Sequence, residues 1–376
     1  MMQTWPILQN ILDLADCATW THALEVSAET AAVWLKGVRA EEIRRIYLTG
    51  CGTSCYAGEV GRNILEQIAH VPAQAMHAFN LGQYLEPAIL GPEVLVIGIS
   101  TSGSTEAVAK ALAHARRYGA RTLALTAEKG GAVAEAAEAV VLTGGEADRT
   151  PVKTKSYVQT LLSLFEVAMV LAEARGLEAR RAYWHSEMDK AAEGTRRFLE
   201  AQREEVQALV ETYGGAQIVF ILASGPNLGT AQEAALKVIE MAKMYCEWAE
   251  LEDFLHCRYR EVDQVNPMVF IAPQGRSSAH VLDVLTVNRY VGAPSVVFTD
   301  VVSEGIGELA SQVVQMPVSL DELATPLLYI TPLHLFAHQM AIRRGWDPLS
   351  RRYDDIVPHR VRYGNLAAGL VGGQRL

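Results

Sequence analysis

Two short segments rich in glycine, serine and threonine constrain this chain most. Gly50-Cys51-Gly52-Thr53-Ser54 follows the apolar residues Ile46-Tyr47-Leu48, and Ser100-Thr101-Ser102-Gly103-Ser104-Thr105 follows the apolar run 94–99. Each pattern is typical of a buried strand that ends in a tight loop and then opens a helix. Such a loop directs backbone N–H groups and hydroxyls to one place beside the positive end of a helix dipole. Both segments therefore indicate phosphate binding.

The residue types narrow the choice of phosphate ligand. Neither segment contains G-x-x-x-x-G-K-[ST], and the glycine spacing of a dinucleotide-binding loop is also missing. Hydroxyl-rich loops favour a small phosphorylated sugar instead. A structural alternative remains, because such clusters also form turns with serine or threonine as helix N-caps. Two clusters at consecutive strand ends favour the binding site, since ligands gather at that edge of a parallel sheet.

Composition restricts the class of protein and its partners. The 376 residues suffice for about two domains, and half of them are hydrophobic, so sizeable cores can form. A formal net charge of −10 argues against a nucleic-acid partner. The five cysteines show no metal-finger spacing and indicate reduced, intracellular usage. With neither a signal peptide nor an apolar stretch of membrane-spanning length, we expect a cytoplasmic protein without a membrane partner, metal site or cofactor.

The order of the expected elements predicts an α/β protein built from two similar doubly wound modules with parallel sheets. We place an N-terminal helical segment at 1–36, a first module at 37–180, a connecting helix at 181–212, a second module at 213–345 and an irregular C-terminal arm at 346–376. Strand, loop and helix follow one another in the same way at the start of both modules, which indicates duplication of one unit.

The expected strands lie near 45–49, 73–77, 94–99, 121–125 and 139–142 in the first module, and near 218–222, 267–272, 294–298 and 312–316 in the second. The helix after the strand at 218–222 is predicted to run through Tyr245.

That helix carries Glu233, Lys237 and Glu240, which share one face because they are four and three residues apart. A solvated face with one Glu–Lys pair would explain them. Their neighbours are almost all small or apolar, however, so the helix is expected to be buried and its charges to need partners. A carboxylate in such surroundings can acquire a pKa suited to proton abstraction.

His256 and Arg258 follow in a stretch with acidic residues before it and arginines after it. A lone histidine is usually a packing or surface residue. Arg258 could grip a substrate carboxylate in a bidentate fashion. Its structural alternative is an ion pair with Glu247, Glu250 or Glu252.

Taken together, these motifs resemble the sugar isomerase (SIS) superfamily in its two-domain form, over nearly the whole chain. Segments 50–54 and 100–105 are similar to its two phosphosugar loops, and Thr154-Lys155-Ser156-Tyr157 is similar to its T-K-[SA]-[FY] element. Glu233-Ala234-Ala235-Leu236-Lys237-Val238-Ile239-Glu240 resembles E-x-A-L-K-x-x-E, and His256 falls where the family has its catalytic histidine.

The resemblance implies a role for each candidate residue. Glu240 would move a proton between sugar C1 and C2, Lys237 would be a pocket cation, and His256, from the neighbouring subunit of a homodimer, would assist ring opening or act as the acid. It also implies that Ser54, Ser100, Ser102 and Thr105 hold the phosphate and nearby sugar hydroxyls. The residues that we expect to bind the substrate, from the motifs and the resemblance together, are Gly52, Thr53, Ser54, Ser100, Thr101, Ser102, Thr105, Lys153, Lys155, Glu233 and Arg258.

The chain departs from the family pattern at several positions, and these departures favour one of the family's activities over the others. We expect no glutaminase segment before the first module. The family's H-G-P reads His256-Cys257-Arg258, and a serine position of the T-K element is Lys153. The resulting expectation is a deglycase that cleaves the C–N bond of a 6-phosphorylated fructosamine-type conjugate. An amino-sugar-phosphate deaminase or aldose–ketose isomerase is the first alternative, and a non-catalytic sugar-phosphate sensor is the second.

Overall fold

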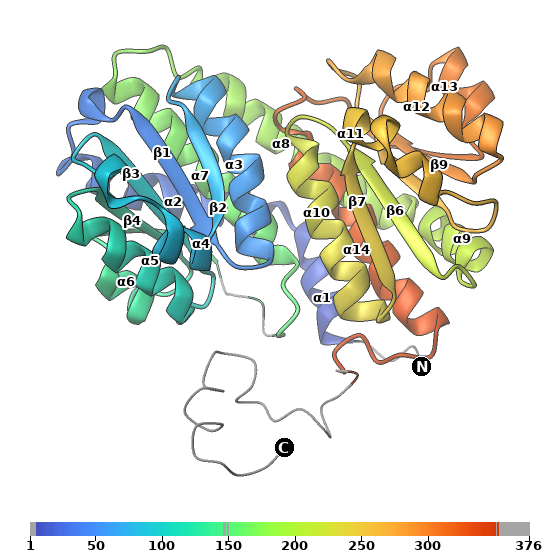
Figure 1. Ribbon diagram of the computed structural model, residues 1–376, viewed down its shortest axis with the longest axis horizontal. Helices are drawn as coiled ribbons and strands as arrows, with labels where there is room; N and C mark the ends of the chain where they lie inside the picture. Colours follow the sequence, from blue (N-terminus) through green and yellow to red (C-terminus); the bar gives the residue numbers. More distant parts are fainter. Residues whose placement is uncertain (1–4, 146–147, 149, 351, 353–376) are drawn as a thin grey trace, which may run out of the picture.

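The computed structural model describes residues 5–145, 148, 150–350 and 352, and it contains two five-stranded parallel sheets beside one another (Figure 1). The strand orders are β2-β1-β3-β4-β5 and β10-β9-β8-β6-β7. Read from its β7 edge, the second sheet repeats the order of the first. The predicted pair of doubly wound α/β modules is therefore confirmed.

The first module begins with two helices that precede its sheet, α1 (Pro6–Leu12) and α2 (Cys17–Leu35). Its strands are β1 (Arg45–Gly50), β2 (Ala73–His77), β3 (Val94–Ile99), β4 (Arg121–Thr126) and β5 (Ala139–Leu142). Its helices are α3 (Thr53–Ile68), α4 (Ala78–Tyr84), α5 (Glu106–Arg117), α6 (Ala132–Ala136) and α7 (Lys155–Ala174).

The second module follows two helices, α8 (Arg181–Ala201) and α9 (Arg203–Tyr213). Its strands are β6 (Ile218–Ala223), β7 (Tyr245–Glu250), β8 (Met268–Ile271), β9 (Ser295–Thr299) and β10 (Gln312–Gln315). Its helices are α10 (Asn227–Lys237), α11 (Leu251–His256), α12 (Ser278–Val291), α13 (Glu304–Leu309) and α14 (Thr325–Arg343).

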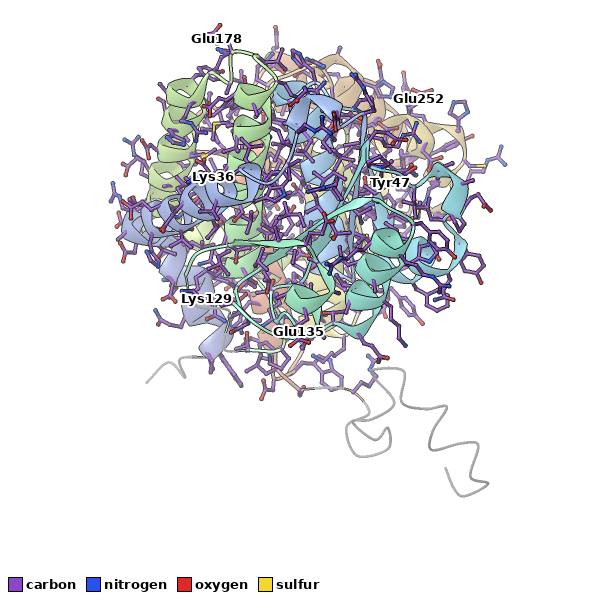
Figure 2. The ribbon with its side chains drawn as sticks, turned by 90° about the vertical axis from the view of Figure 1, so that its left-hand side faces the viewer. Lys36, Tyr47, Lys129, Glu135, Glu178 and Glu252 are labelled. Carbon is purple, nitrogen blue, oxygen red and sulfur yellow. The ribbon has the colours of Figure 1, made fainter. Side chains whose placement is uncertain are left out.

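The largest hydrophobic core lies between the two sheets and spans both modules. It joins residues of α2, α3 and α7 to residues of α10 and α14. The outer faces of the sheets have smaller cores of their own, under α4 and α5 in the first module and under α11 and α12 in the second. Figure 2 looks onto the first module, where Tyr47 of β1 belongs to its outer core.

Helix α7 contradicts the expectation that the chain has no apolar stretch of membrane-spanning length. It has 20 residues and is long and apolar enough to cross a membrane by length and composition, although no such stretch was expected. Within the protein 89% of its apolar window is buried. Its apolar surface is accounted for by the central core, where α7 packs against α2 and α3.

Two helix predictions were wrong in their boundaries. The helix expected through Tyr245 ends at Ala242: α10 passes into a π-helical turn at Val238–Ala242, Lys243 adopts a left-handed conformation, and the chain continues as strand β7. The single connecting helix expected at 181–212 is broken at Gln202 into α8 and α9. Most of the arm expected from residue 346 lies outside the described residues.

The modules meet closely where α3 crosses α10 (Figure 1). Gly229 allows this approach, because a Cβ atom placed there would lie 2.6 Å from the backbone oxygen of Tyr56 and 2.7 Å from a methyl group of Val60. The crossing fixes α10, and with it Glu233 and Lys237, against the start of α3.

We therefore expect Gly229→Ala to lower the free energy of unfolding by about 1–3 kcal/mol, the usual cost of overpacking. Gly307 in α13 provides the matched control, because a Cβ atom there meets nothing within 4 Å. Gly307→Ala should leave stability unchanged or raise it by about 0.5–1 kcal/mol through helix propensity. Chemical denaturation measures both, and equal stability of the two variants would contradict the tight crossing.

Candidate functional site

The first predicted phosphate loop forms a sharp turn between β1 and α3. Gly50 must be glycine, because a Cβ atom there would lie 2.7 Å from the backbone of Ser54. Gly52 has a φ of +53°, which lets the chain turn directly into α3 at Thr53. Ser54 occupies the first helical turn beside it. The backbone N–H groups of Ser54 and Cys55 donate to the carbonyls of Cys51 and Gly52 and hold this turn in shape.

The second predicted phosphate loop is held by backbone hydrogen bonds to the sheet, and several of its hydroxyls contact one another. The backbone of Ser100 and Thr101 is hydrogen-bonded to the end of β4, and Gly103 turns with a φ of +63°. Ser100 and Thr105 share a hydrogen bond of 2.8 Å between their hydroxyls. Ser102, on the exposed side, contacts the Ser104 hydroxyl at 2.9 Å.

Strand pairing brings these two loops to the same edge of the sheet. β1 and β3 are parallel neighbours in register, so their carboxyl ends lie together. This is also the point where strand order reverses, because β2 continues on one side of β1 and β3 on the other. Ligands of doubly wound sheets bind at such a switch point.

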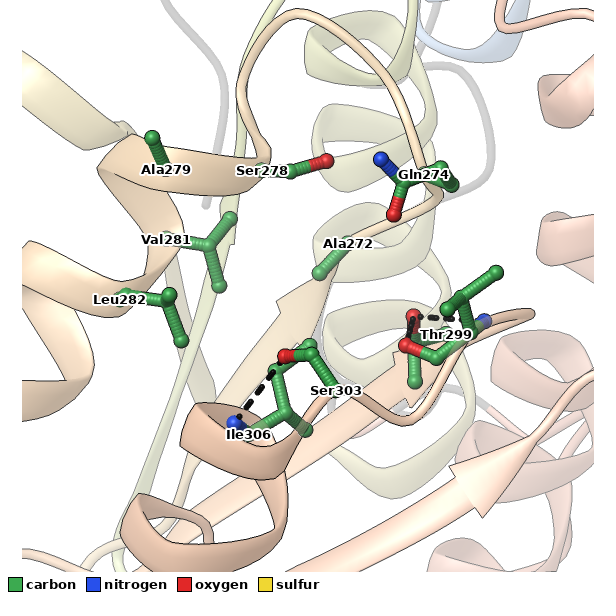
Figure 3. Close-up of a pocket in the computed structure, with 10 residues that line it drawn as sticks. Ala272, Gln274, Ser278, Ala279, Val281, Leu282, Thr299, Ser303 and Ile306 are labelled. Carbon is green, nitrogen blue, oxygen red and sulfur yellow. Dashed lines mark hydrogen bonds between the residues drawn. The ribbon is translucent and has the colours of Figure 1, made fainter.

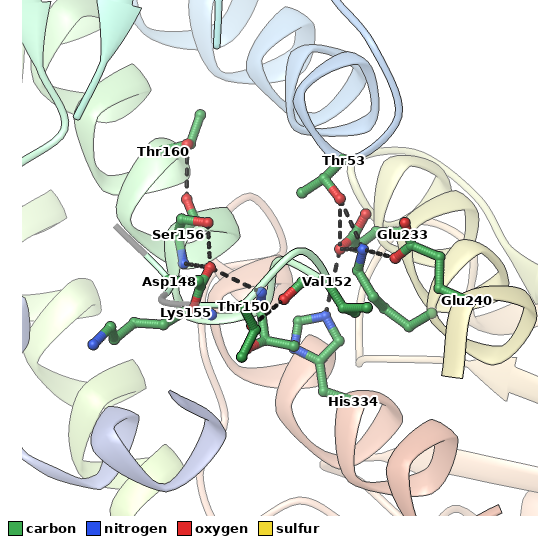
Figure 4. A network of polar contacts seen from close by, with 12 residues as sticks. Thr53, Asp148, Thr150, Val152, Lys155, Ser156, Thr160, Glu233, Glu240 and His334 are labelled. Carbon is green, nitrogen blue, oxygen red and sulfur yellow. Dashed lines mark hydrogen bonds and ion pairs between the residues drawn. The ribbon is translucent and has the colours of Figure 1, made fainter. Parts of the chain in front are cut away.

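A buried ammonium group joins this edge to the second module (Figure 4). Lys237 is fully buried, and its Nζ lies 2.6 Å from Glu240 Oε2 and 3.3 Å from Glu233 Oε1. The same Nζ donates to the Thr53 hydroxyl at 2.9 Å. Thr53 in turn donates to Glu233 at 3.3 Å. The predicted pair of loop and charged helix face is therefore brought together in one cluster.

Glu240 is the charged member of this cluster that reaches solvent. Its side chain is 34% exposed, whereas those of Glu233 and Lys237 are inaccessible. Glu240 lies inside the π-helical turn, which departs from regular helical spacing at this position. π-Helical turns recur at functional sites because they re-aim a side chain without ending the helix.

Burial and charge set the protonation of the inner pair. Burial raises the pKa of Glu233 to about 7, although the Lys237 ammonium acts in the opposite direction. Burial alone would lower the pKa of Lys237, but the carboxylates of Glu233 and Glu240 outweigh that effect and raise it. Lys237 is therefore cationic at neutral pH and can hold negative charge at its Thr53 side.

Sequence reasoning missed His334 of α14, which packs under the cluster with its Nε2 3.6 Å from Glu233 Oε1. Burial and the nearby Lys237 charge lower the pKa of His334 to about 3. One turn later, burial lowers the pKa of His338 to about 4. Both rings are therefore neutral. The available signal was a pair of histidines four residues apart in an otherwise apolar helix.

The T-K segment supports the site from one side without its lysines entering the cluster. Asp148 accepts hydrogen bonds from the backbone N–H groups of Thr154, Lys155 and Ser156, and so caps α7. Lys155 pairs with Asp13 at 3.0 Å, away from Glu233 (Figure 4). Lys153 donates to the carbonyls of Asp148 and Thr150, and burial, together with Lys237, lowers its pKa.

Within a single chain, His256 and Arg258 lie away from the Lys237 cluster. Glu240 precedes β7 and His256 follows it, so the length of the strand separates them, about 20 Å for six residues at about 3.3 Å each. The His256 side chain is 75% exposed, and its Nε2 lies 3.1 Å from Glu252 Oε1. Glu252 is a surface residue, labelled in Figure 2. Arg258 forms an ion pair with Glu247 at 2.9 Å and donates to the Trp248 carbonyl. This is the structural role that the sequence left open as an alternative to substrate binding.

Comparison with known proteins fits this geometry. The profile of the SIS domain matches residues 41–171 and 215–344, one match for each module. This chain belongs to the SIS-domain family. The matches cover both sheets and, in the second module, the helices that carry the Lys237 cluster.

Relatives of this SIS chain include metabolic enzymes of sugar phosphates. It is 27% identical over 309 residues to glutamine–fructose-6-phosphate aminotransferase (isomerizing) of Caldanaerobacter subterraneus, covering 82% of this chain and 50% of that protein. The chain thus spans about half the length of the curated relatives it matches.

Two solved structures share the fold of both SIS modules. The C-terminal domain of the glucosamine-fructose-6-phosphate aminotransferase of Francisella tularensis superposes with a TM-score of 0.83 at 19% identity, covering 93% of this chain and 99% of that one. Glucosamine-6-phosphate deaminase of Thermotoga maritima does so with a TM-score of 0.72 at 19% identity, covering 93% and 98%.

The two buried histidines predict how stability depends on pH. Each stays neutral in the folded chain but binds a proton in the unfolded chain below its ordinary pKa, so stability falls as pH falls from about 6.5 toward the folded values. Between about pH 7.5 and 5.5 each should cost about 1.4 kcal/mol. His334→Gln and His338→Gln should each flatten this dependence, and the double variant should flatten it most. Denaturant unfolding at several pH values tests this; an unchanged slope in the double variant would contradict it.

Proposed function

We propose that this chain is a cytoplasmic, phosphosugar-processing enzyme that uses proton transfer between C1 and C2. Its substrate is a 6-phosphorylated fructosamine-type conjugate, whose C–N bond it cleaves. The observation that carries this proposal is the solvent-reaching Glu240, held by buried Lys237, which in turn contacts Thr53 of the first phosphate loop. A base and a phosphate cradle are thereby fixed in one rigid frame.

The two loops supply the anchor for the phosphate. Ser100, Ser102 and Thr105 present hydroxyls, and helices α3 and α5 begin beside them. The Lys237 ammonium adds positive charge near Thr53, in a chain whose overall charge is −10. Local donors and a local cation, rather than the field of the whole protein, thus attract the sugar phosphate.

Glu240 is suited to the proton transfer. It would take the proton from C1 of the open-chain fructosamine, which forms a C1=C2 double bond, and the proton would return at C2. The product is a C1=N imine, which one water molecule hydrolyses to a hexose phosphate and a free amine. Lys237 contacts the Glu240 carboxylate at 2.6 Å and would hold it in place for the proton transfer.

The same proton transfer would serve an amino-sugar-phosphate deaminase or an aldose–ketose isomerase. The relative named glutamine–fructose-6-phosphate aminotransferase carries the word isomerizing in its name, which supports keeping these alternatives. A non-catalytic sensor would need no base in contact with solvent. Incubation with phosphorylated fructosamines, amino-sugar phosphates and ketose phosphates, with products identified by mass spectrometry, separates the activities.

Glu240→Gln keeps the shape of the side chain and removes its proton-accepting power. We expect turnover to fall by roughly 10²- to 10⁴-fold, the usual contribution of a general base, while substrate still binds. Glu59→Gln, on the half-buried flank of α3, is the matched control and should retain turnover. Near-normal turnover of Glu240→Gln would assign Glu240 to structure alone.

The acid proposed for this reaction is His256 of a second copy. Within one chain β7 separates His256 from Glu240, and the His256 ring is exposed and available to a neighbour. A homodimer with shared sites resolves this separation. Arg258 would accompany His256 to that site and could meet a substrate carboxylate only by leaving Glu247.

Mixing inactive Glu240→Gln with inactive His256→Ala tests the shared site. After subunit exchange, activity should recover to about a quarter of wild type, because half of the dimers are hybrids and each hybrid contains one intact site. Exchange is verified with differently tagged chains. Verified hybrids without activity would show that each site is built within one chain.

A further inference from the structure

The second module contains a cleft that repeats the frame of the first phosphate site. It lies at the carboxyl ends of β6 and β8, neighbours that correspond to β1 and β3 in the repeated strand order. The cleft has a volume of about 310 Å³ and is lined by Ser224, Gly225, Arg276 and Glu322, among others. Nothing in the proposed reaction uses it.

Its first loop matches the first phosphate loop in backbone conformation. Gly225, two residues after β6, has a φ of +60°, and Gly52, two residues after β1, has a φ of +53°. Helix α10 begins directly after this turn, as α3 does in the first module. Ser224, before the glycine, occupies the place of Cys51 and donates to Glu250.

Its second loop matches in length and in key residues. Six residues separate β8 from α12, as six separate β3 from α5. Ala272-Pro273-Gln274-Gly275-Arg276-Ser277 therefore aligns with Ser100-Thr101-Ser102-Gly103-Ser104-Thr105, keeping the glycine and the final hydroxyl. The change of greatest electrostatic effect is Arg276 in place of Ser104.

The third wall of the cleft comes from the other module, as in the first site. There α10 of the second module faces the start of α3; here the late turns of α3 face the start of α10 and contribute Asn63 and Gln67. Gln67 lies fifteen residues after Gly52, just as Glu240 lies fifteen residues after Gly225. An amide thus stands where the first site has its proposed base.

Charge and hydrogen-bonding groups define the class of ligand. Within the described residues, α3, α5, α10 and α12 all begin without a side-chain cap, so both clefts have two helix N-termini open to an anion. Arg276 is exposed and, in that same part of the chain, has no ion-pair partner. Glu322 accepts the Arg276 backbone N–H at 3.3 Å, and its carboxylate favours a ligand that also carries hydroxyl donors.

A neighbouring hollow does not share these properties. It lies on the other side of the loop at 272–278, has a volume of about 230 Å³, and is lined mainly by Val281, Leu282 and Ile306 (Figure 3). The hydroxyl of Ser278, a polar residue on its rim, is already hydrogen-bonded to the backbone N–H and carbonyl of Gly275. The charged groups therefore distinguish the cleft at Arg276.

We propose that this cleft is a second, non-catalytic binding site for a sugar phosphate. The phosphate lies between Arg276, Ser277 and the starts of α10 and α12, and the hydroxyls meet Glu322, Asn63 and Gln67. Because Gln67 cannot accept a proton as a carboxylate does, a ligand bound there is held and not converted. This site goes beyond the proposed reaction.

Calorimetric titration of the full chain with fructose 6-phosphate tests the proposal. We expect two molecules bound per chain in the wild type. Arg276→Ala with Ser277→Ala should weaken the second site by about 10-fold or more, since hydrogen bonds to charged groups contribute about 1.5–3 kcal/mol, and should leave turnover without added ligand unchanged. Arg289→Ala, at the exposed far end of α12, is the matched control and should bind two.

The outcomes separate this site from the proposed reaction. Ser102→Ala with Thr105→Ala should remove the first site and leave the one at Arg276. A single molecule per wild-type chain, lost with the Ser102 and Thr105 changes, would overturn the second site and keep the first. Two molecules that persist in the Arg276 and Ser277 variant would also overturn it. Equal binding of fructose would contradict the role of the phosphate, and stronger binding of inorganic phosphate than of fructose 6-phosphate would contradict the role of Glu322.

Discussion

The buried ammonium of Lys237 is the group on which the arrangement of the site depends. An unpaired charge in this position would be too costly to bury, so Glu233, Glu240 and Thr53 must lie around it. Thr53 belongs to the first module and the other three belong to the second. One electrostatic requirement therefore aligns the phosphate loop of one module with the acidic residues of the other and holds Glu240 at the surface of the cluster.

Close packing makes that alignment possible, and it also creates the symmetry of the molecule. Gly229 lets α10 approach the backbone of Tyr56, and these two residues occupy equivalent places after Gly225 and Gly52. Each helix therefore contributes the same position to the crossing, and exchanging the two modules leaves the crossing nearly unchanged. The start of each helix faces the late turns of the other, so the cleft at Arg276 has the same frame as the site at Glu240. In the proposals made above, Glu240 and Lys237 serve chemistry in one site, while Gln67 and Arg276 serve binding in the other.

Much of this was predictable from local sequence. Every strand except β7, which was not expected, lies close to its expected position, because short apolar runs bounded by glycine and polar residues are strong strand signals. The glycine and hydroxyl pattern located the tight loops that precede α3 and α5, and the spacing of Glu233, Lys237 and Glu240 placed them on one face. The helix through Tyr245 was wrong for a physical reason. An apolar segment of this length suits a helix as well as an edge strand, and the left-handed turn at Lys243 decides between them.

By itself, the sequence determined the α/β class, the duplication, the two tight loops after β1 and β3 and the buried character of α10, because each depends on periodicity or turn chemistry within a short segment. Tertiary structure decided which distant residues meet. His334 packs beneath Glu233, Lys155 turns to Asp13, Arg258 pairs with Glu247, and β7 carries His256 away from Glu240. These partnerships depend on helix packing across two sheets. Local patterns contain no information on them, because burial and charge neutralisation are satisfied only when the whole chain has folded.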